Sequence, residues 1–83
     1  MREYIATFYN HFGAVRFERE LRKMGAPARM MPVPRDLSSS CGTAVKFQRE
    51  ESDFSDFRDE HGEIEQIAEI LEKSYRVLWK SQS

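Results

Sequence analysis

The residue of this chain best suited to covalent chemistry is Cys41, which lies in the stretch PRDLSSSCG over residues 34–42. A thiolate is the reactive form of cysteine, and an unperturbed thiol with a pKa of about 8.5 is ionised only to a few per cent at neutral pH. A working thiol therefore needs hydrogen-bond donors or cations beside it. Backbone N–H groups in a turn that Gly42 makes flexible would serve. The other candidate donors are Arg35, Ser38, Ser39 and Ser40.

Two other arrangements of the same stretch would leave Cys41 unreactive. Asp36 is a suitable N-cap for one helical turn through residues 38–40, and Cys41 would then lie at the C-terminal end of that turn, where the helix dipole opposes a thiolate. Alternatively, Cys41 is a small core residue at the start of a strand, since free cysteines are often buried. We favour a working thiol because the stretch is serine-rich and follows two prolines, which is typical of a surface loop.

The two histidines add no recognisable motif. His11, Cys41 and His61 lack the paired spacing of metal ligands, and a single cysteine forms neither an internal disulfide nor a CxxC pair. We therefore expect no metal, no bound cofactor, and histidines that are solvated or capping. A histidine acting as general base for Cys41 remains an alternative, and it would make the protein a cysteine-dependent enzyme.

Apolar patterns indicate the elements that position this loop. Residues 4–9 (YIATFY) predict a strand, and Asn10 is a suitable N-cap for a helix that ends at Gly25. Residues 28–32 (ARMMP) and 43–48 (TAVKFQ) predict strands on either side of the serine loop. The helix is expected to bury one face, made of Ala14, Phe17, Leu21 and Met24.

The second half of the chain predicts a second helix and a last strand. Residues 63–73 place Ile64, Ile67, Ala68 and Leu71 on one helical face, with acidic residues first and Lys73 last. Residues 75–79 (YRVLW) predict a strand, and the acidic stretch 50–60 predicts an exposed connection whose Phe54 and Phe57 pack back on the domain. The order βαββαβ predicts an α+β, ferredoxin-like plait, with a four-stranded antiparallel sheet and two helices on one face.

Length and charge limit the classes of function. With 83 residues, of which 40% are hydrophobic, residues 1–83 are expected to form a single domain. A net charge of −1 offers no general attraction for nucleic acid. No apolar run approaches the roughly 18 residues that span a membrane, and no signal peptide is evident, so we expect a cytoplasmic protein. Exposed sheet edges make a homodimer a reasonable expectation.

The stretches YIATFYNHFGAVRFERELRKMG and MPVPRDLSSSCGTAVKF resemble the selenium/sulfur (Se/S) carrier protein-like family, formerly a domain of unknown function. The most specific part of the resemblance is the core P-R-x-[LI]-S-S-S-C-G, in which this chain shows no departure. The resemblance implies that Cys41 carries sulfur or selenium as a persulfide or selenosulfide. It also implies that the pocket around the carried atom is shaped by Arg35, Ser38, Ser39, Ser40 and Gly42.

A carrier of this kind is expected to have two protein partners: a cysteine desulfurase-like donor that loads Cys41, and an acceptor protein that unloads it. The lack of a second thiol suits this function, because no neighbouring cysteine resolves the loaded group into a disulfide. The alternative from another class is a regulatory module that binds a small ligand or a protein and in which Cys41 is only structural.

Overall fold

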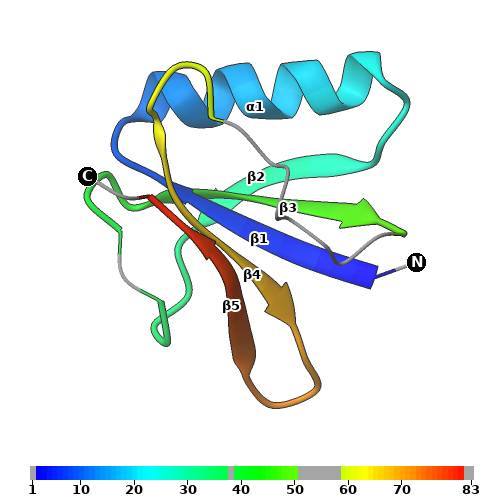
Figure 1. The fold of residues 1–83 in the computed structure, drawn as a ribbon, viewed down its shortest axis with the longest axis vertical. Coiled ribbons are helices and arrows are strands. Elements are labelled where there is room, and N and C mark those ends of the chain that lie inside the picture. The colour runs from blue at the N-terminus through cyan, green and yellow to red at the C-terminus, as the bar shows by residue number, and fades with distance from the viewer. Residues whose placement is uncertain (1, 38, 51–58, 82–83) are drawn as a thin grey trace.

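The computed structural model describes residues 2–37, 39–50 and 59–81. These residues form a five-stranded sheet, and Figure 1 shows a helix lying across it. All neighbouring strands are antiparallel, in the order β2-β3-β1-β4-β5. The elements are β1 (Arg2–Phe8), α1 (His11–Lys23), β2 (Ala28–Pro32), β3 (Thr43–Arg49), β4 (Ile64–Ile70) and β5 (Tyr75–Lys80). The α+β class is therefore confirmed, but the described residues form five strands and one helix instead of four strands and two helices.

The helix begins and ends at local signals in the sequence. The side chain of Asn10 accepts a hydrogen bond from the N–H of Gly13 at 2.8 Å, which satisfies one of the free donors of the first turn. After Lys23 the chain turns at Gly25, whose φ of +81° is a conformation that glycine adopts without strain. One part of the helix prediction is wrong, because Met24 lies beyond the last helical residue and is 77% exposed.

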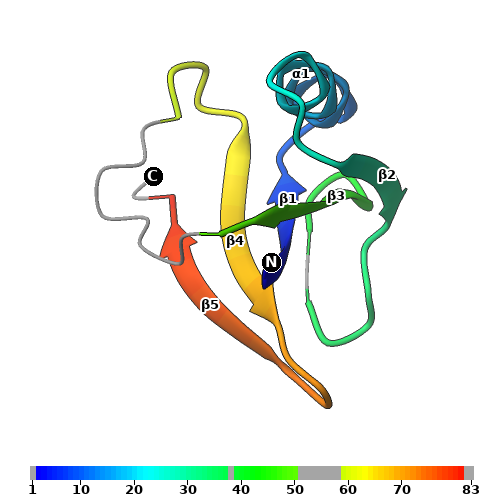
Figure 2. The same cartoon turned by 90° about the vertical axis from the view of Figure 1, so that its right-hand side faces the viewer.

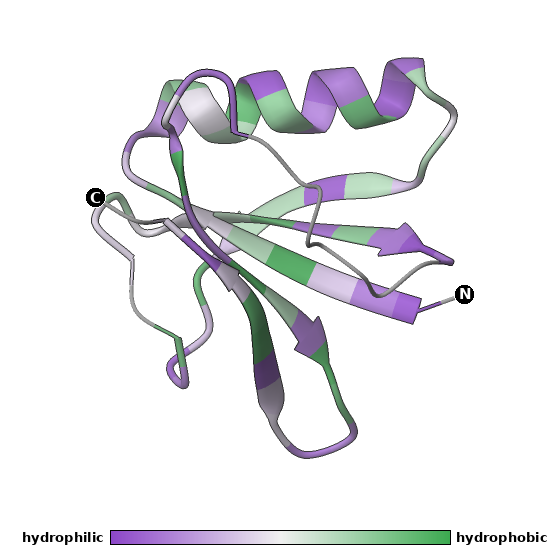
Figure 3. Ribbon diagram, viewed as in Figure 1, coloured by the Kyte–Doolittle hydropathy of each residue, from purple (hydrophilic) through white to green (hydrophobic). Residues whose placement is uncertain are grey.

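Helix α1 packs on one face of the sheet over β1, β2 and β3, as the end-on view in Figure 2 shows. In the hydropathy colouring of Figure 3, green and purple patches alternate along the helix, as expected of an amphipathic element. The core between helix and sheet is aromatic, with ring centroids 5.3 to 5.6 Å apart. Its rings are those of Tyr4, Phe8, Phe17 and Phe47.

The opposite face of the sheet is also covered near its centre. Ile5, Ala44 and Ala68 form a second buried cluster there, against which Val33 and Leu37 pack from the loop that follows β2. Strand β1 is therefore buried on both faces, as residues 4–9 predict, although it ends at Phe8. The expected packing of Phe54 and Phe57 lies outside the described residues.

The second predicted helix is wrong, because Ile64–Ile70 forms strand β4 and pairs with both β1 and β5. A bulge explains the helix-like spacing. Phe8 pairs with Ile64 and Thr7 with Gln66, so Glu65 is an extra residue opposite β1. Ile64 and Ile67 consequently face the same aromatic core although they are three residues apart. Ala68 and Ile70 face the second cluster, and a strand buried on both faces thus imitates a helical stripe.

Helix α1 has 13 residues, and no helix in the described ranges is long and apolar enough to cross a membrane.

Candidate functional site: the loop of Cys41

Residues 33–42 connect the edge strand β2 to β3 and carry Cys41 at one end of the sheet. The N–H of Val33 donates to the carbonyl of Gly42 at 3.2 Å and closes the base of the loop. Val33 and Leu37 pack on the second cluster, whereas Cys41 packs against the aromatic core beneath α1. The loop therefore bends around the end of the sheet and places Cys41 on the side that the helix covers.

Cys41 is half-buried, and its sulfur has two polar neighbours among the described residues. The thiol donates to the carbonyl oxygen of Thr43, with 3.8 Å between Sγ and O, and the Oγ of Ser39 lies 4.0 Å from Sγ. Ser39 also donates its hydroxyl proton to the carbonyl of Phe8 at 3.0 Å. Because a hydroxyl has a single proton, Ser39 then acts only as an acceptor toward sulfur. A thiol also has a single proton, so Cys41 donates either to Thr43 or to Ser39 at any one time.

The residue next to the thiol is held by a carboxylate from another strand. Glu65 accepts two hydrogen bonds from Ser40, one from the backbone N–H at 2.9 Å and one from Oγ at 3.1 Å. A carboxylate bound by a backbone N–H and a hydroxyl forms charge-assisted hydrogen bonds, which are among the stronger ones in proteins. The donors of Ser40, which the sequence suggests as partners for a sulfur anion, are therefore occupied by Glu65.

Three of the predicted site residues lie within two residues of Cys41, and Arg35 lies in an earlier turn of the same loop. Ser39 and Ser40 lie beside Cys41, and Gly42 has a φ of +74°, which accounts for glycine at the bend into β3. Arg35 is exposed in a turn closed by the N–H of Leu37 on the carbonyl of Pro34. Ser38 lies outside the described residues.

The helical turn that Asp36 would cap is not formed in the described part of the loop. Residues 35 and 36 form a turn, residue 39 has no regular secondary structure, and residues 40–42 form a bend. The proposed opposition between a helix C-terminus and a thiolate at Cys41 therefore does not arise from these residues.

The histidines lie in two separate places. His11 Nδ1 is 3.4 Å from the Oγ1 of Thr43, so this ring reaches the strand that begins beside Cys41. His61 Nε2 is 3.4 Å from a guanidinium nitrogen of Arg16 on α1. No group of three acidic, histidine or cysteine side chains suited to hold a metal ion occurs within the described ranges.

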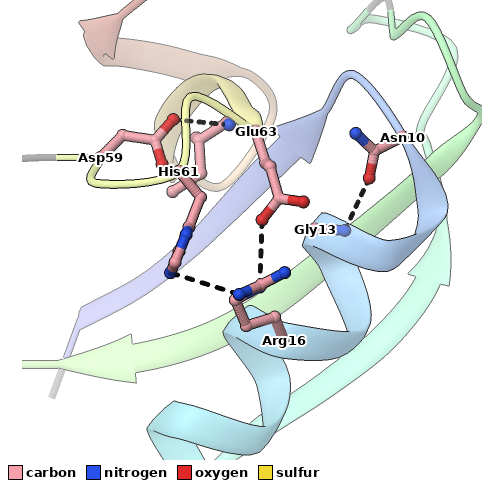
Figure 4. A network of polar contacts seen from close by, with 7 residues as sticks. Asn10, Gly13, Arg16, Asp59, His61 and Glu63 are labelled. Carbon is pink, nitrogen blue, oxygen red and sulfur yellow. Dashed lines mark hydrogen bonds and ion pairs between the residues drawn. The ribbon is translucent and has the colours of Figure 1, made fainter.

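A polar network fixes the segment before β4 against the first turns of α1 (Figure 4). Arg16 forms an ion pair with Glu63 at 3.2 Å, and Asp59 accepts the N–H of Ile64 at 2.8 Å. The N–H of Tyr9 donates to the carbonyl of Glu63 at 2.9 Å. These bonds fix the backbone immediately before Glu65, and so they help to determine the position of its side chain.

Glu65 and Thr43 contact the loop, and the sequence interpretation missed both. Glu65 is 25 residues from Ser40, and the periodicity of its neighbours favours a helix, which gives no reason to bring the two together. The sequence predicts Thr43 only as the first residue of a strand. A local motif identifies the thiol, whereas the contact between Glu65 and Ser40 depends on the register of the sheet.

The match to a protein family covers both the loop and Glu65. The family described as "Putative Se/S carrier protein-like" matches residues 3–69 of the 83, and the chain belongs to this family. Searches of curated proteins and of solved structures found no match.

Proposed function

We propose that this protein carries sulfur or selenium on Cys41, as a persulfide or a selenosulfide. The observation that carries the proposal is the family match, because the matched region contains the only cysteine of the chain and that cysteine lies half-buried in a loop. The further pocket residues in this proposal are Arg35, Ser38, Ser39, Ser40 and Gly42.

The loading step is an exchange at sulfur with no net oxidation. The Cys41 thiolate attacks the terminal sulfur of a donor persulfide, a bond forms between Sγ and that sulfur, and the S–S bond of the donor breaks. The donor leaves as a thiolate and keeps the electron pair of the broken S–S bond. One proton is lost when the Cys41 thiol ionises, and one proton is gained when the donor thiolate becomes a thiol. An acceptor thiolate then removes the terminal sulfur in the same way and regenerates Cys41.

The single thiol suits this cycle. A second cysteine nearby would attack the Sγ of the loaded Cys41, release the carried sulfur and leave an internal disulfide. Because the chain has no second cysteine, unloading requires a thiol from another molecule. We accordingly propose a cysteine desulfurase-like donor and a separate acceptor protein, both meeting the carrier in the reducing cytoplasm.

The experiment is intact-mass analysis of the reduced protein after incubation with a low-molecular-weight persulfide. We expect a product heavier by one sulfur atom on the wild type, with none on Cys41→Ser. A low-molecular-weight selenosulfide in place of the persulfide compares selenium with sulfur in the same assay. The proposal is overturned if the wild type gains no sulfur or selenium, or if Cys41→Ser gains as much.

A further inference from the structure

Glu65 binds the loop of Cys41 through its carboxylate. Both of its carboxylate oxygens accept bonds from Ser40, the residue that precedes the thiol. Among the ion pairs of the described residues, none involves Glu65. Within the described residues, the carboxylate of Glu65 is bound by the N–H and the hydroxyl of Ser40.

The backbone position of Glu65 is fixed by the sheet. It is the extra residue of the β4 bulge opposite β1, and bulges change the direction of a side chain relative to its strand. Its carbonyl accepts the N–H of Ser81 at 2.9 Å, just after β5. The bulge thus presents a carboxylate at the end of the sheet where the chain enters β3.

We propose that Glu65 is a positioning and specificity-determining residue for Cys41: it holds the turn that presents the thiol, and its charge disfavours small anionic sulfur donors there. This inference rests on the proposed carrier function. Free low-molecular-weight persulfides carry negative charge at neutral pH, so the carboxylate repels them. A protein donor differs, because its sulfur arrives on a surface whose own cations can offset Glu65.

The charge and the positioning effects of Glu65 are separable. Gln retains the shape of Glu and can bond to both groups of Ser40, so Glu65→Gln removes the charge and keeps the turn. Glu65→Ala removes the charge and both bonds. At the separation of adjacent residues, a single charge in a water-like medium changes the rate of an anionic reagent about threefold. The effect is expected to shrink as salt is added.

The test compares alkylation of Cys41 by neutral iodoacetamide and by anionic iodoacetate, in the folded protein and at one pH. The ratio of the two rate constants cancels any change in the fraction of thiolate, and it also cancels a uniform change in access. We expect Glu65→Gln to lower the iodoacetamide-to-iodoacetate ratio about threefold relative to wild type. For Glu65→Ala we expect the same loss of discrimination, with both rates altered because the turn is released.

Glu72→Gln is the matched control, because it makes the same change of net charge in the turn at the other end of β4. Its ratio should equal that of the wild type. The inference is overturned if Glu65→Gln leaves the iodoacetamide-to-iodoacetate ratio unchanged. It is also overturned if Glu72→Gln lowers this ratio as much as Glu65→Gln does. The test does not depend on Glu65→Ala, so it remains valid if that variant does not fold. Alkylation does not require Cys41 to carry sulfur, so a failure of the carrier proposal appears separately, as a missing mass adduct.

Discussion

Gly13 lies in the first turn of α1, where the helix meets the segment before β4. A Cβ built at this position would lie 2.6 Å from the Cβ of Glu63 and 3.3 Å from a ring carbon of Phe8. An ordinary contact between carbon atoms is about 3.5–4.0 Å, so Gly13→Ala requires a movement of roughly 1 Å. Glu63 cannot move freely, because its carbonyl is bonded to Tyr9 and its side chain to Arg16.

Two opposing terms determine the effect of Gly13→Ala on stability. Alanine favours a helix over glycine by up to about 1 kcal/mol, whereas overpacking a buried contact costs about 1–3 kcal/mol. We expect the clash to outweigh the propensity and the free energy of unfolding to fall by about 1–2 kcal/mol. For a domain of this size that is a large fraction of the total.

A double-mutant cycle in urea tests this reasoning. Glu63→Gly removes the atom that the new Cβ meets, so Gly13→Ala in that background should be neutral or stabilising. The coupling between the two sites is then at least about 1 kcal/mol. If Gly13→Ala stabilises the wild type, or costs the same with and without the Glu63 side chain, the close packing of α1 on this segment is refuted.

Two further predictions concern stability and are measured by the same urea unfolding. Thr7 is fully buried, and its Oγ1 has no hydrogen-bond partner within the described structure. Thr7→Val should therefore raise the free energy of unfolding by about 1 kcal/mol. A fall in the free energy of unfolding would instead indicate that the hydroxyl has a partner. Asn10→Ala should lower stability by about 1 kcal/mol by removing the cap, while Asn10→Asp should retain most of it; equal losses in both variants would exclude capping as the cause.

The first half of the fold is predictable because its signals are local. Asn10 and Gly25 mark the ends of α1 within a few residues, and Ala28–Pro32 is the strand that its apolar residues and closing prolines indicate. The prediction for the second half of the fold is wrong for a reason that the spacing of residues in the sequence does not show. The bulge at Glu65 puts two isoleucines three residues apart on the same face of a strand, and only the pairing with β1 distinguishes this from a helix.

The candidate site is likewise predictable only where its signals are local. Cys41 is recognisable from PRDLSSSCG alone, and Ser39 and Ser40 lie beside it in the structure. Which groups those serines bind was not predictable, because their partners come from the end of β1 and from the β4 bulge. The Ser39 hydroxyl and the N–H and hydroxyl of Ser40 are bound within the protein instead, by the carbonyl of Phe8 and the carboxylate of Glu65.

A complete cycle of loading and release tests the carrier account most directly. The protein is loaded from a persulfide donor, freed of the donor by gel filtration, and then exposed to an acceptor thiol while its intact mass is followed. The account predicts that one sulfur atom is gained at Cys41, survives the separation, and is lost to the acceptor as the original mass returns. A wild-type protein that never gains that atom, or that gains it at a site retained in Cys41→Ser, would contradict the account.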